Sequence, residues 1–240
     1  MRIAVFSDVH GNFEALESVL SACGELSADR LICLGDTVGY GADPQACLEQ
    51  VMEMSEIVVA GNHDWAVAGL EDPRFFNSAA MAAIRWTRDR LSKDSCAVLR
   101  GLPLTAEEPE VLFVHSSPED PQNWHYLFSI SEGRSAMAAT DAALTFVGHS
   151  HVSFVSSTSD AVRLTREGEV ELSPDDRYLV NVGSVGQPRD NDPRAAFALW
   201  ERDERRVTLH RVAYDVPAAQ AKIRDAGLPA ICADRLEYGG

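Results

Sequence analysis

Long hydrophobic runs, a signal peptide and an excess of basic residues are all missing from this sequence. The apolar runs, such as residues 3–6 and 111–114, are far shorter than the roughly 20 residues that a membrane-spanning helix needs. The chain carries 21 Lys and Arg against 37 Asp and Glu, a net charge of −16, which repels polyanions at long range. We therefore expect no membrane association and no non-specific binding to nucleic acids.

Cysteine is scarce and has no recognisable spacing. The five cysteines are an odd number, and none forms a Cys-x-x-Cys pair, which argues against a disulfide framework or a cysteine-rich zinc site. Because no basic and apolar leader resembling a signal peptide opens the chain, we expect reduced, mostly buried thiols in a cytoplasmic protein. The cysteines are Cys23, Cys33, Cys47, Cys96 and Cys232.

The remaining composition is that of an ordinary globular domain. Hydrophobic residues make up 45% and charged residues 24% of the 240 residues, a balance that excludes wholesale disorder. A chain of this length buries a sizeable core without the support of a disulfide or a zinc ion. We expect a single domain over residues 1–215, with a C-terminal helix and tail over residues 216–240 packed on it.

Strand and helix patterns alternate in the first half of the chain, and short strands dominate the second half. Apolar residues with helical spacing over 12–22, 44–54 and 78–91 lie between strand-like runs. From residue 144 onwards, short strand patterns separated by turn residues follow one another. We predict an α/β fold in which two packed, mostly mixed β-sheets are flanked by helices, an αββα sandwich.

Five polar segments follow directly after apolar strand patterns. A single Asp or His in such a place is usually a turn or capping residue, but five strand ends that all carry metal-binding side chains are improbable as turn chemistry. The carboxyl ends of strands in α/β sheets form the crevice where ligands bind, so these side chains are expected to converge. The segments are Asp8-Val9-His10, Gly35-Asp36, Gly61-Asn62-His63-Asp64, His115 and Gly148-His149-Ser150-His151.

The residue types in these segments favour a transition-metal centre. Asp-x-His and His-x-His in extended backbone place both side chains on one face, because the strand period is two. Carboxylate, imidazole and amide groups without thiolates suit Mn, Fe, Zn, Co or Ni better than an all-oxygen calcium site. Seven candidate ligands exceed what one tetrahedral ion uses, so two metal ions are expected. The seven are Asp8, His10, Asp36, Asn62, His115, His149 and His151.

In this order, the motifs resemble those of the calcineurin-like metallophosphoesterases, and the resemblance covers about residues 1–190. It implies a metallophosphoesterase fold and two divalent metal ions, of which manganese is favoured. The implied ligands are Asp8, His10 and His151 for the first ion, Asn62, His115 and His149 for the second, and Asp36 bridging both.

The resemblance also implies a mechanism. A hydroxide that bridges the two metal ions attacks phosphorus, since a pair of divalent ions lowers the pKa of bound water and holds the phosphoryl oxygens. His63 faces the substrate rather than the metal ions and protonates the leaving oxygen as a general acid. Asp64 orients His63 and favours its protonated form.

Differences from the family pattern narrow the range of substrate classes that we expect. Protein phosphatases of the family usually carry Gly-Asp-x-x-Asp-Arg-Gly, whose Arg holds a phosphomonoester, whereas residues 35–41 here lack that Asp and that Arg. The chain therefore looks more like the small bacterial and archaeal phosphodiesterase branch, which residues 181–190 also resemble. Within that stretch Arg189 either contacts phosphate or pairs with Asp190 or Asp192, and Asn62 is a second candidate for substrate binding.

Other functions remain open from the sequence. A dinucleoside polyphosphate hydrolase, a phosphomonoesterase or a protein phosphatase would use the same chemistry. A non-catalytic interaction scaffold is disfavoured by the presence of His63 and all seven candidate ligands, and a calcium or structural metal site by the five imidazoles. Residues 124–128, unusually aromatic for a loop, either stack on an aromatic group of a substrate or form a core or dimer contact. The expected partner is a small phosphorylated substrate, and a homodimer is permitted without being required.

Overall fold

The computed structural model describes the backbone of residues 1–240 and every side chain except that of Arg163. Within these residues the chain forms twelve strands and eight α-helices, with four short 3-10 helices. The strands are β1 (Arg2–Phe6), β2 (Arg30–Cys33), β3 (Ile57–Val58), β4 (Thr105–Glu108), β5 (Val111–Val114), β6 (Leu144–Val147), β7 (Phe154–Ser157), β8 (Arg163–Thr165), β9 (Gly168–Glu171), β10 (Tyr178–Asn181), β11 (Ala195–Glu201) and β12 (Arg206–Val212). The helices are α1 (Phe13–Glu25), α2 (Pro44–Met54), α3 (Asn62–Ala68), α4 (Ser78–Arg88), α5 (Lys93–Gly101), α6 (Ile130–Ala136), α7 (Val216–Asp225) and α8 (Ala230–Asp234), and the 3-10 helices are η1 (Pro73–Phe75), η2 (Pro121–Asn123), η3 (Met137–Ala139) and η4 (Arg235–Glu237).

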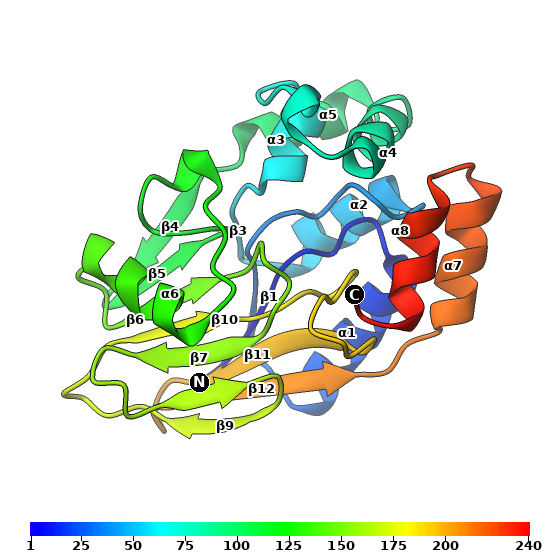
Figure 1. Cartoon of the computed structure of the whole chain (residues 1–240). Helices are drawn as coiled ribbons and strands as arrows, with labels where there is room; N and C mark the ends of the chain where they lie inside the picture. Colours follow the sequence, from blue (N-terminus) through cyan, green and yellow to red (C-terminus); the bar gives the residue numbers. More distant parts are fainter.

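The strands are arranged in two six-stranded mixed sheets (Figure 1). The strand order is β3-β2-β1-β11-β12-β9 in the first sheet and β4-β5-β6-β10-β7-β8 in the second. In the first sheet β1, β2 and β3 are parallel, and in the second β5, β6 and β10 are parallel. Each sheet therefore has three neighbouring strands whose carboxyl ends lie along the same edge, and the polar motifs follow these strands.

The two sheets face each other, and helices cover their outer faces. Val5 of β1 and Phe146 of β6 lie in the core between the sheets. Phe6, the next residue of β1, faces the opposite side, where it packs with α1 and α2, and Val114 of β5 packs in the same way near α6. Fully burying one such side chain contributes about 1.5–3 kcal/mol to stability. This αββα arrangement confirms the predicted fold class.

Several helix boundaries follow from capping residues that are visible in the sequence. The side chain of Asn12 accepts a hydrogen bond from the backbone three residues on, at 3.2 Å, and α1 begins there. Asn77 does the same at α4, at 3.0 Å. Both helices match predicted ranges to within three residues at either end. Helices α3, α5, α6 and α8 and strand β4 have no counterpart among the predicted elements. Helix α5, for example, buries only two side chains and so has a weak apolar pattern.

The C-terminal segment, which contains α7 and α8, packs beside α1, α2 and α4 (Figure 1). The indole Nε1 of Trp86 in α4 donates a hydrogen bond to the carbonyl oxygen of Ala226 at 2.9 Å. Lys222 of α7 forms an ion pair with Asp43, just before α2, at 2.8 Å. The apolar cluster under these helices also includes Tyr40, so the segment reaches the loop that follows β2.

All five cysteines are free thiols, and all but Cys96 are buried. Burial raises the pKa of the Cys23 and Cys33 thiols to about 12, so neither is a thiolate nucleophile at neutral pH. The expectation that most of the thiols are buried is confirmed. In the part of the chain that the structure describes, none of the helices combines the length and apolar character needed to cross a bilayer.

Candidate metal centre

The seven predicted metal ligands, together with His63 and Asp64, lie at the carboxyl ends of the parallel strands of both sheets, and all nine are buried. Their side chains meet because the two sheets pack face to face, and the ligand atoms within each of three overlapping groups lie within 4.8 Å of one another. The groups are Asp8, His10 and His151; Asp36, His115 and His149; and His10, Asp36 and His63. Asn62 follows β3 as the first residue of α3.

The backbone at five of the seven predicted ligands is left-handed rather than extended. The φ angle is 56° at Asp8, 50° at His10, 51° at Asp36, 63° at His149 and 60° at His151. The predicted geometry, two residues on one face of a continuing strand, is therefore wrong for Asp-x-His and His-x-His: the strand has ended, and the chain turns sharply at each of these five ligands. Such conformations cost on the order of 1–3 kcal/mol each and cluster at functional sites, where packing holds them in place.

At two positions of the motifs only glycine fits, because the backbone there passes very close to the carboxylate of Asp36 or Asp8. A Cβ on Gly61 would lie 2.0 Å from Asp36 Oδ1, and a Cβ on Gly148 would lie 2.6 Å from Asp8 Oδ2. No side chain tolerates such distances. Glycine at these positions lets the start of α3 and the end of β6 lie against the site.

The first group forms around Asp8. His151 Nε2 lies 3.1 Å from Asp8 Oδ1 and 3.1 Å from His10 Nε2. His10 Nε2 is in turn 3.6 Å from Asp8 Oδ1. Three potential ligand atoms from the ends of β1 and β6 thus face one small volume.

Asp36 lies between this group and the second one. Its Oδ2 is 3.6 Å from His10 Nε2 and 3.5 Å from His115 Nε2. His115 Nε2 lies 3.2 Å from His149 Nδ1. The backbone N–H of His63 donates to Asp36 Oδ1 at 2.8 Å and fixes the carboxylate in this position. Asp36 is the residue whose placement suits a ligand shared by two ions.

The histidine ring nitrogens at the centre of the site fit a bound cation. In each of four histidines the outer ring nitrogen is within hydrogen-bond distance of a backbone carbonyl, and a neutral imidazole carries only one N–H. Where two facing rings are both neutral and donate outward, their inner nitrogens meet as lone pairs, which a cation satisfies and a hydrogen bond between them cannot. The outer contacts are His10 Nδ1 to Val38 O at 3.2 Å, His115 Nδ1 to Leu34 O at 2.8 Å, His149 Nε2 to Trp124 O at 2.9 Å and His151 Nδ1 to Gln187 O at 2.5 Å.

Two oxygen atoms of the predicted ligands also indicate that the site is suited to a bound cation. Asp8 Oδ1 and Asn62 Oδ1 are buried and have no hydrogen-bond partner. Buried acceptors without a partner are rare in folded proteins, because each costs about 1–3 kcal/mol. Oxygen and imidazole donors that point inward without partners are suited to hold divalent transition-metal ions.

The charges of the site are set by competition between burial and the two carboxylates. Burial lowers the pKa of His149 to about 3 and that of His151 to about 4, so both rings are neutral at pH 7. Burial also opposes a charge on His115, but Asp36 and Asp8 outweigh it and raise the pKa of His115 to about 9. Without metal, the site holds a proton on His115 that a cation would have to replace.

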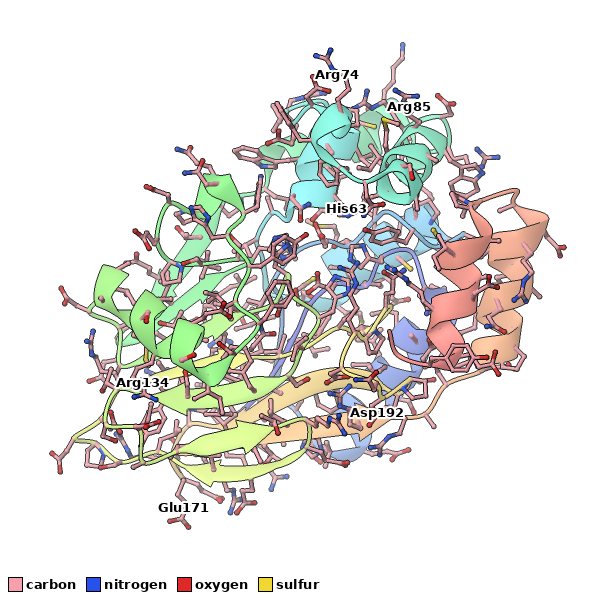
Figure 2. The ribbon with its side chains drawn as sticks, viewed as in Figure 1. His63, Arg74, Arg85, Arg134, Glu171 and Asp192 are labelled. Carbon is pink, nitrogen blue, oxygen red and sulfur yellow. The ribbon has the colours of Figure 1, made fainter. Side chains whose placement is uncertain are left out.

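His63 lies beside the metal-binding groups on the side of α3 that faces the strand ends (Figure 2). Its ring centroid is 4.8 Å from that of His10, 4.6 Å from that of Tyr40 and 5.1 Å from that of Phe76. Its Nδ1 is buried without a hydrogen-bond partner. Burial holds the pKa of His63 well below its ordinary value, so the ring is neutral before an anion binds.

The sequence predicts that Asp64 orients His63, but the carboxylate of Asp64 has other partners. Its Oδ1 accepts a hydrogen bond from Val38 N at 3.3 Å and its Oδ2 accepts one from Gly61 N at 3.1 Å. The bond from Gly61 N is one half of a capping box at the start of α3; the other half is missing because Gly61 has no side chain. Burial, together with the nearby Asp36, raises the pKa of Asp64 to about 7. Asp64 therefore fixes the first turn of the helix that carries His63 instead of charging its imidazole.

A pocket of about 380 Å³ opens beside His63, Asn62 and His149, and aromatic residues line two of its sides. One side comes from η1 and the residue after it, and the other from the aromatic loop, residues 124–128. Tyr126 stacks on His149 with ring centroids 3.9 Å apart and remains 46% exposed. Trp124 and Tyr126 of the aromatic loop thus belong to the wall of the site, whereas Leu127 of the same loop packs in the core.

Arg189 lines the same pocket. Its guanidinium lies 5.6 Å from the ring centroid of Tyr40, the residue that stands where the Gly-Asp-x-x-Asp-Arg-Gly pattern has its Arg. Asp190 and Asp192 form ion pairs with other arginines, and Arg189 pairs with neither. The interpretation of Arg189 as half of a surface ion pair is therefore wrong, and its charge faces the site.

Most residues that orient the predicted ligands could not be identified from the sequence motifs, because they act through their backbone carbonyl groups. Leu34, Val38 and Trp124 each hold a histidine in this way, and a carbonyl oxygen leaves no mark on residue type. Gln187 does lie in the stretch singled out from the sequence, residues 181–190. Tyr40, which packs on both His10 and His63, could have been found as the replacement for the missing Arg.

Comparison with known proteins agrees with this geometry. The model of the calcineurin-like phosphoesterase superfamily domain matches residues 1–205. A protein of Methanocaldococcus jannaschii is 38% identical over 241 residues, which cover 99% of this chain and 98% of that one. The crystal structure of a metallophosphoesterase from Sphaerobacter thermophilus is 39% identical with a TM-score of 0.89, and the match covers 100% of this chain and 99% of that one. A Pyrococcus horikoshii protein, 21% identical over 100% of this chain and 98% of its own, shares the fold with a TM-score of 0.81. The chain belongs to the calcineurin-like phosphoesterase superfamily.

Proposed function

We propose that this protein hydrolyses phosphodiesters with the help of two divalent metal ions, of which manganese is favoured. The observation that carries the proposal is the pair of inward-facing ligand groups that share the carboxylate of Asp36 beside an open pocket. Two such ions, when bound, activate a water molecule and neutralise charge on the phosphoryl oxygens. The residues that would hold them are Asp8, His10 and His151 for one ion, Asn62, His115 and His149 for the other, and Asp36 for both.

His63 is proposed as the proton donor to the leaving oxygen. It is adjacent to the ligand groups, lines the pocket and has a buried ring nitrogen without a partner. A phosphate anion in the pocket favours the protonated ring, because an opposite charge nearby raises the pKa of an imidazole. Proton donation of this kind contributes typically 10²–10⁴-fold to a rate.

The preference for diesters rests on the cations that surround the pocket. A phosphomonoester dianion needs more positive charge than a diester anion, and the family's Arg in the segment after β2 is replaced here by Tyr40. Arg189 is the one guanidinium among the residues that line the pocket, and it is proposed to contact a phosphoryl oxygen. Asn62, whose amide group also lines the pocket, is proposed to contact the substrate as well as a metal ion.

The test is hydrolysis by metal-depleted protein that is reloaded with Mn²⁺, Zn²⁺, Co²⁺, Ni²⁺ or Fe²⁺. Bis(4-nitrophenyl) phosphate and 4-nitrophenyl phosphate are compared under identical conditions. We expect metal-stimulated turnover, a higher kcat/KM for the diester, and loss of bound metal in Asp36→Asn. A preference for the monoester would replace the diesterase assignment with a phosphomonoesterase, and absence of metal-stimulated turnover with either substrate would reject catalysis in favour of a scaffold.

A further inference from the structure

Two guanidinium groups meet at one neutral oxygen atom beside the metal centre. Arg189 Nη2 and Arg235 Nη1 both donate hydrogen bonds to Gln187 Oε1, at 2.9 Å and 3.1 Å. The two donor nitrogens are therefore at most about 6 Å apart. Arg235 lies in η4, beyond the residues matched by the superfamily model.

Neither guanidinium has a carboxylate partner. Among the residues whose side chains the structure describes, no Asp or Glu lies within ion-pair distance of Arg189 or Arg235, although the chain has a net charge of −16. Arg224, in the same C-terminal segment, does pair with Asp234 at 3.0 Å. Two uncompensated like charges held this close repel each other, and the amide oxygen between them carries no charge to offset the repulsion.

The hydrogen-bonding capacity of the two side chains is also unused. The Nε atoms of Arg189 and Arg235 are both buried without a hydrogen-bond partner. Each guanidinium offers five N–H donors, and unsatisfied buried donors in a native protein call for an explanation such as a missing ion. Uncompensated charge and unused donors at one place are two independent signs of an anion.

The surrounding backbone fixes the two arginines relative to each other. Arg189 N donates to the carbonyl oxygen of His151 at 3.1 Å, next to the metal ligands. On the other side, the carbonyl oxygen of Arg235 accepts from Gly239 N at 3.0 Å, and Gly239 O accepts from Asn191 N at 2.7 Å. In Figure 1 the red C-terminal end lies beside the yellow segment that follows β10. The tail is thus docked on the loop that carries Arg189.

We propose that Arg189 and Arg235 form a second anion site that binds another phosphate group of the same substrate. Arg189 lines the catalytic pocket, and Arg235, which shares Gln187 Oε1 with it, is not among the lining residues, so the site extends beyond that pocket. The substrate class is then a phosphoester with at least two linked phosphates, because a planar guanidinium pair matches the oxygens of a phosphate chain. This inference rests on the proposed function only for the phosphate group at the metal centre. Binding of the other phosphate group by the two arginines does not depend on it.

Direct binding tests the anion site without catalysis. Inorganic pyrophosphate is titrated into metal-free protein by calorimetry, with wild type, Arg235→Gln, Arg235→Lys and Arg224→Gln compared. We expect Arg235→Gln to weaken binding at least tenfold, Arg235→Lys to weaken it less, and Arg224→Gln, which removes the same charge from an exposed ion pair, to leave it unchanged. Equal affinities for wild type and Arg235→Gln overturn the proposal, and unchanged thermal unfolding shows that the variants are folded.

Substrate preference separates failure of this site from failure of the proposed function. Bis(4-nitrophenyl) phosphate is compared with the corresponding diphosphate, in which two linked phosphates join the nitrophenyl groups. We expect the ratio of kcat/KM, diphosphate over monophosphate, to fall at least tenfold in Arg235→Gln and to stay the same in Arg224→Gln. An unchanged ratio in Arg235→Gln overturns the second site, whereas a wild type that is inactive on both substrates with every metal overturns the proposed function and leaves the pyrophosphate titration to decide the anion site.

Discussion

Four histidines at the site each direct one nitrogen outward to a backbone carbonyl and the other inward, so the backbone determines which atom is offered to a metal. His149 shows the consequence most clearly: its outer Nε2 contacts Trp124 O, and Nδ1 is left to face His115. Trp124 adopts a left-handed backbone with φ of 53°, which is unusual for so large a residue. The aromatic loop is therefore coupled to the orientation of a predicted ligand.

His63→Asn tests the proton donor. Because the ring lies beside the ligand groups without a hydrogen bond at Nδ1, its loss should reduce kcat by about 10²–10⁴-fold while metal content stays that of the wild type. Turnover and metal content of the loaded protein are the two measurements. His125→Asn, an exposed histidine that does not line the pocket, is the matched control. A variant that keeps more than a tenth of the rate would leave His63 with a structural role only.

Proton release on metal binding tests the charge state of His115. Its pKa of about 9 means that the metal-free protein holds this proton below pH 9, and a ligand histidine must be neutral. Affinity for Mn²⁺ should therefore rise with pH up to about 9, by about tenfold per pH unit while this proton alone is displaced. Calorimetry at pH 7.5 in buffers of different ionisation enthalpy should show about one proton released from His115 per protein molecule, on filling of the site to which His115 belongs. Release of no proton would mean that His115 is already neutral.

At the level of secondary-structure elements, the first turn of helix α3, which begins shortly after β3 ends, is part of the site. Asn62 and His63 are its first two residues, and the carboxylate of Asp64 caps its start by accepting a hydrogen bond from Gly61 N. The backbone N–H of His63 also donates to Asp36. A predicted turn motif is thus the beginning of a helix, and its hydrogen bonds join the ends of β2 and β3.

Gly61→Ala tests this junction. The added Cβ would lie 2.0 Å from Asp36 Oδ1 and 2.4 Å from Asp36 N, so the carboxylate has to move. We expect metal affinity to fall by about 10–100-fold, as when an orienting contact of a ligand is lost, and stability to fall by about 1–3 kcal/mol. Metal titration and urea unfolding measure the two effects.

Gly101→Ala is the control for that substitution. Gly101 is the last residue of α5, and a Cβ there meets nothing within 4 Å. Alanine in a helix is favoured over glycine by roughly 0.5–1 kcal/mol, so this variant should be as stable as the wild type or slightly more so. Equal metal affinities in Gly61→Ala and the wild type would show that Asp36 tolerates the displacement or does not bind metal.

At the level of the whole molecule, a buried ion pair ties the loop after β10 to both sheets. Arg211 of β12, whose side chain is fully buried, pairs with Asp190 and donates to Ser153 Oγ at 3.1 Å, just before β7. Asp190 follows Arg189 directly, so the pair also anchors the residue that faces the pocket. The first sheet thus helps to position a loop that extends from the second.

Removing one partner of this pair should destabilise the fold. In Arg211→Met the Asp190 carboxylate is left buried without its counter-charge, and the free energy of unfolding should fall by about 3–5 kcal/mol. The double variant Arg211→Met/Asp190→Leu removes both charges and should recover a large part of that loss. Urea unfolding of both variants measures the difference. Equal instability of the single and double variants would show that shape, not charge, dominates at this place.

The types of the functional residues, their order and their place after strands could be predicted from the sequence. Residue identity decides which side chains bind metal, and short-range periodicity decides which segments become strands, so Asp8, Asp36, His115 and the two histidines after β6 were found without coordinates. The same local signals predicted the two helix-flanked sheets. They did not show α3, α5, α6, α8 or β4, which are short elements, and in α5 and β4 the apolar pattern is also too weak to stand out.

What only the tertiary structure decided is how those residues are held. The left-handed backbone at the ligands, the contact of His115 with the carbonyl of Leu34 and the meeting of Arg235 with Gln187 all depend on segments far apart in the chain. Such contacts form only once both sheets and the C-terminal helices have packed, because burial removes water as the competing hydrogen-bond partner. Residue type is local information, whereas the direction of a lone pair or an unpaired charge is set by the packed molecule.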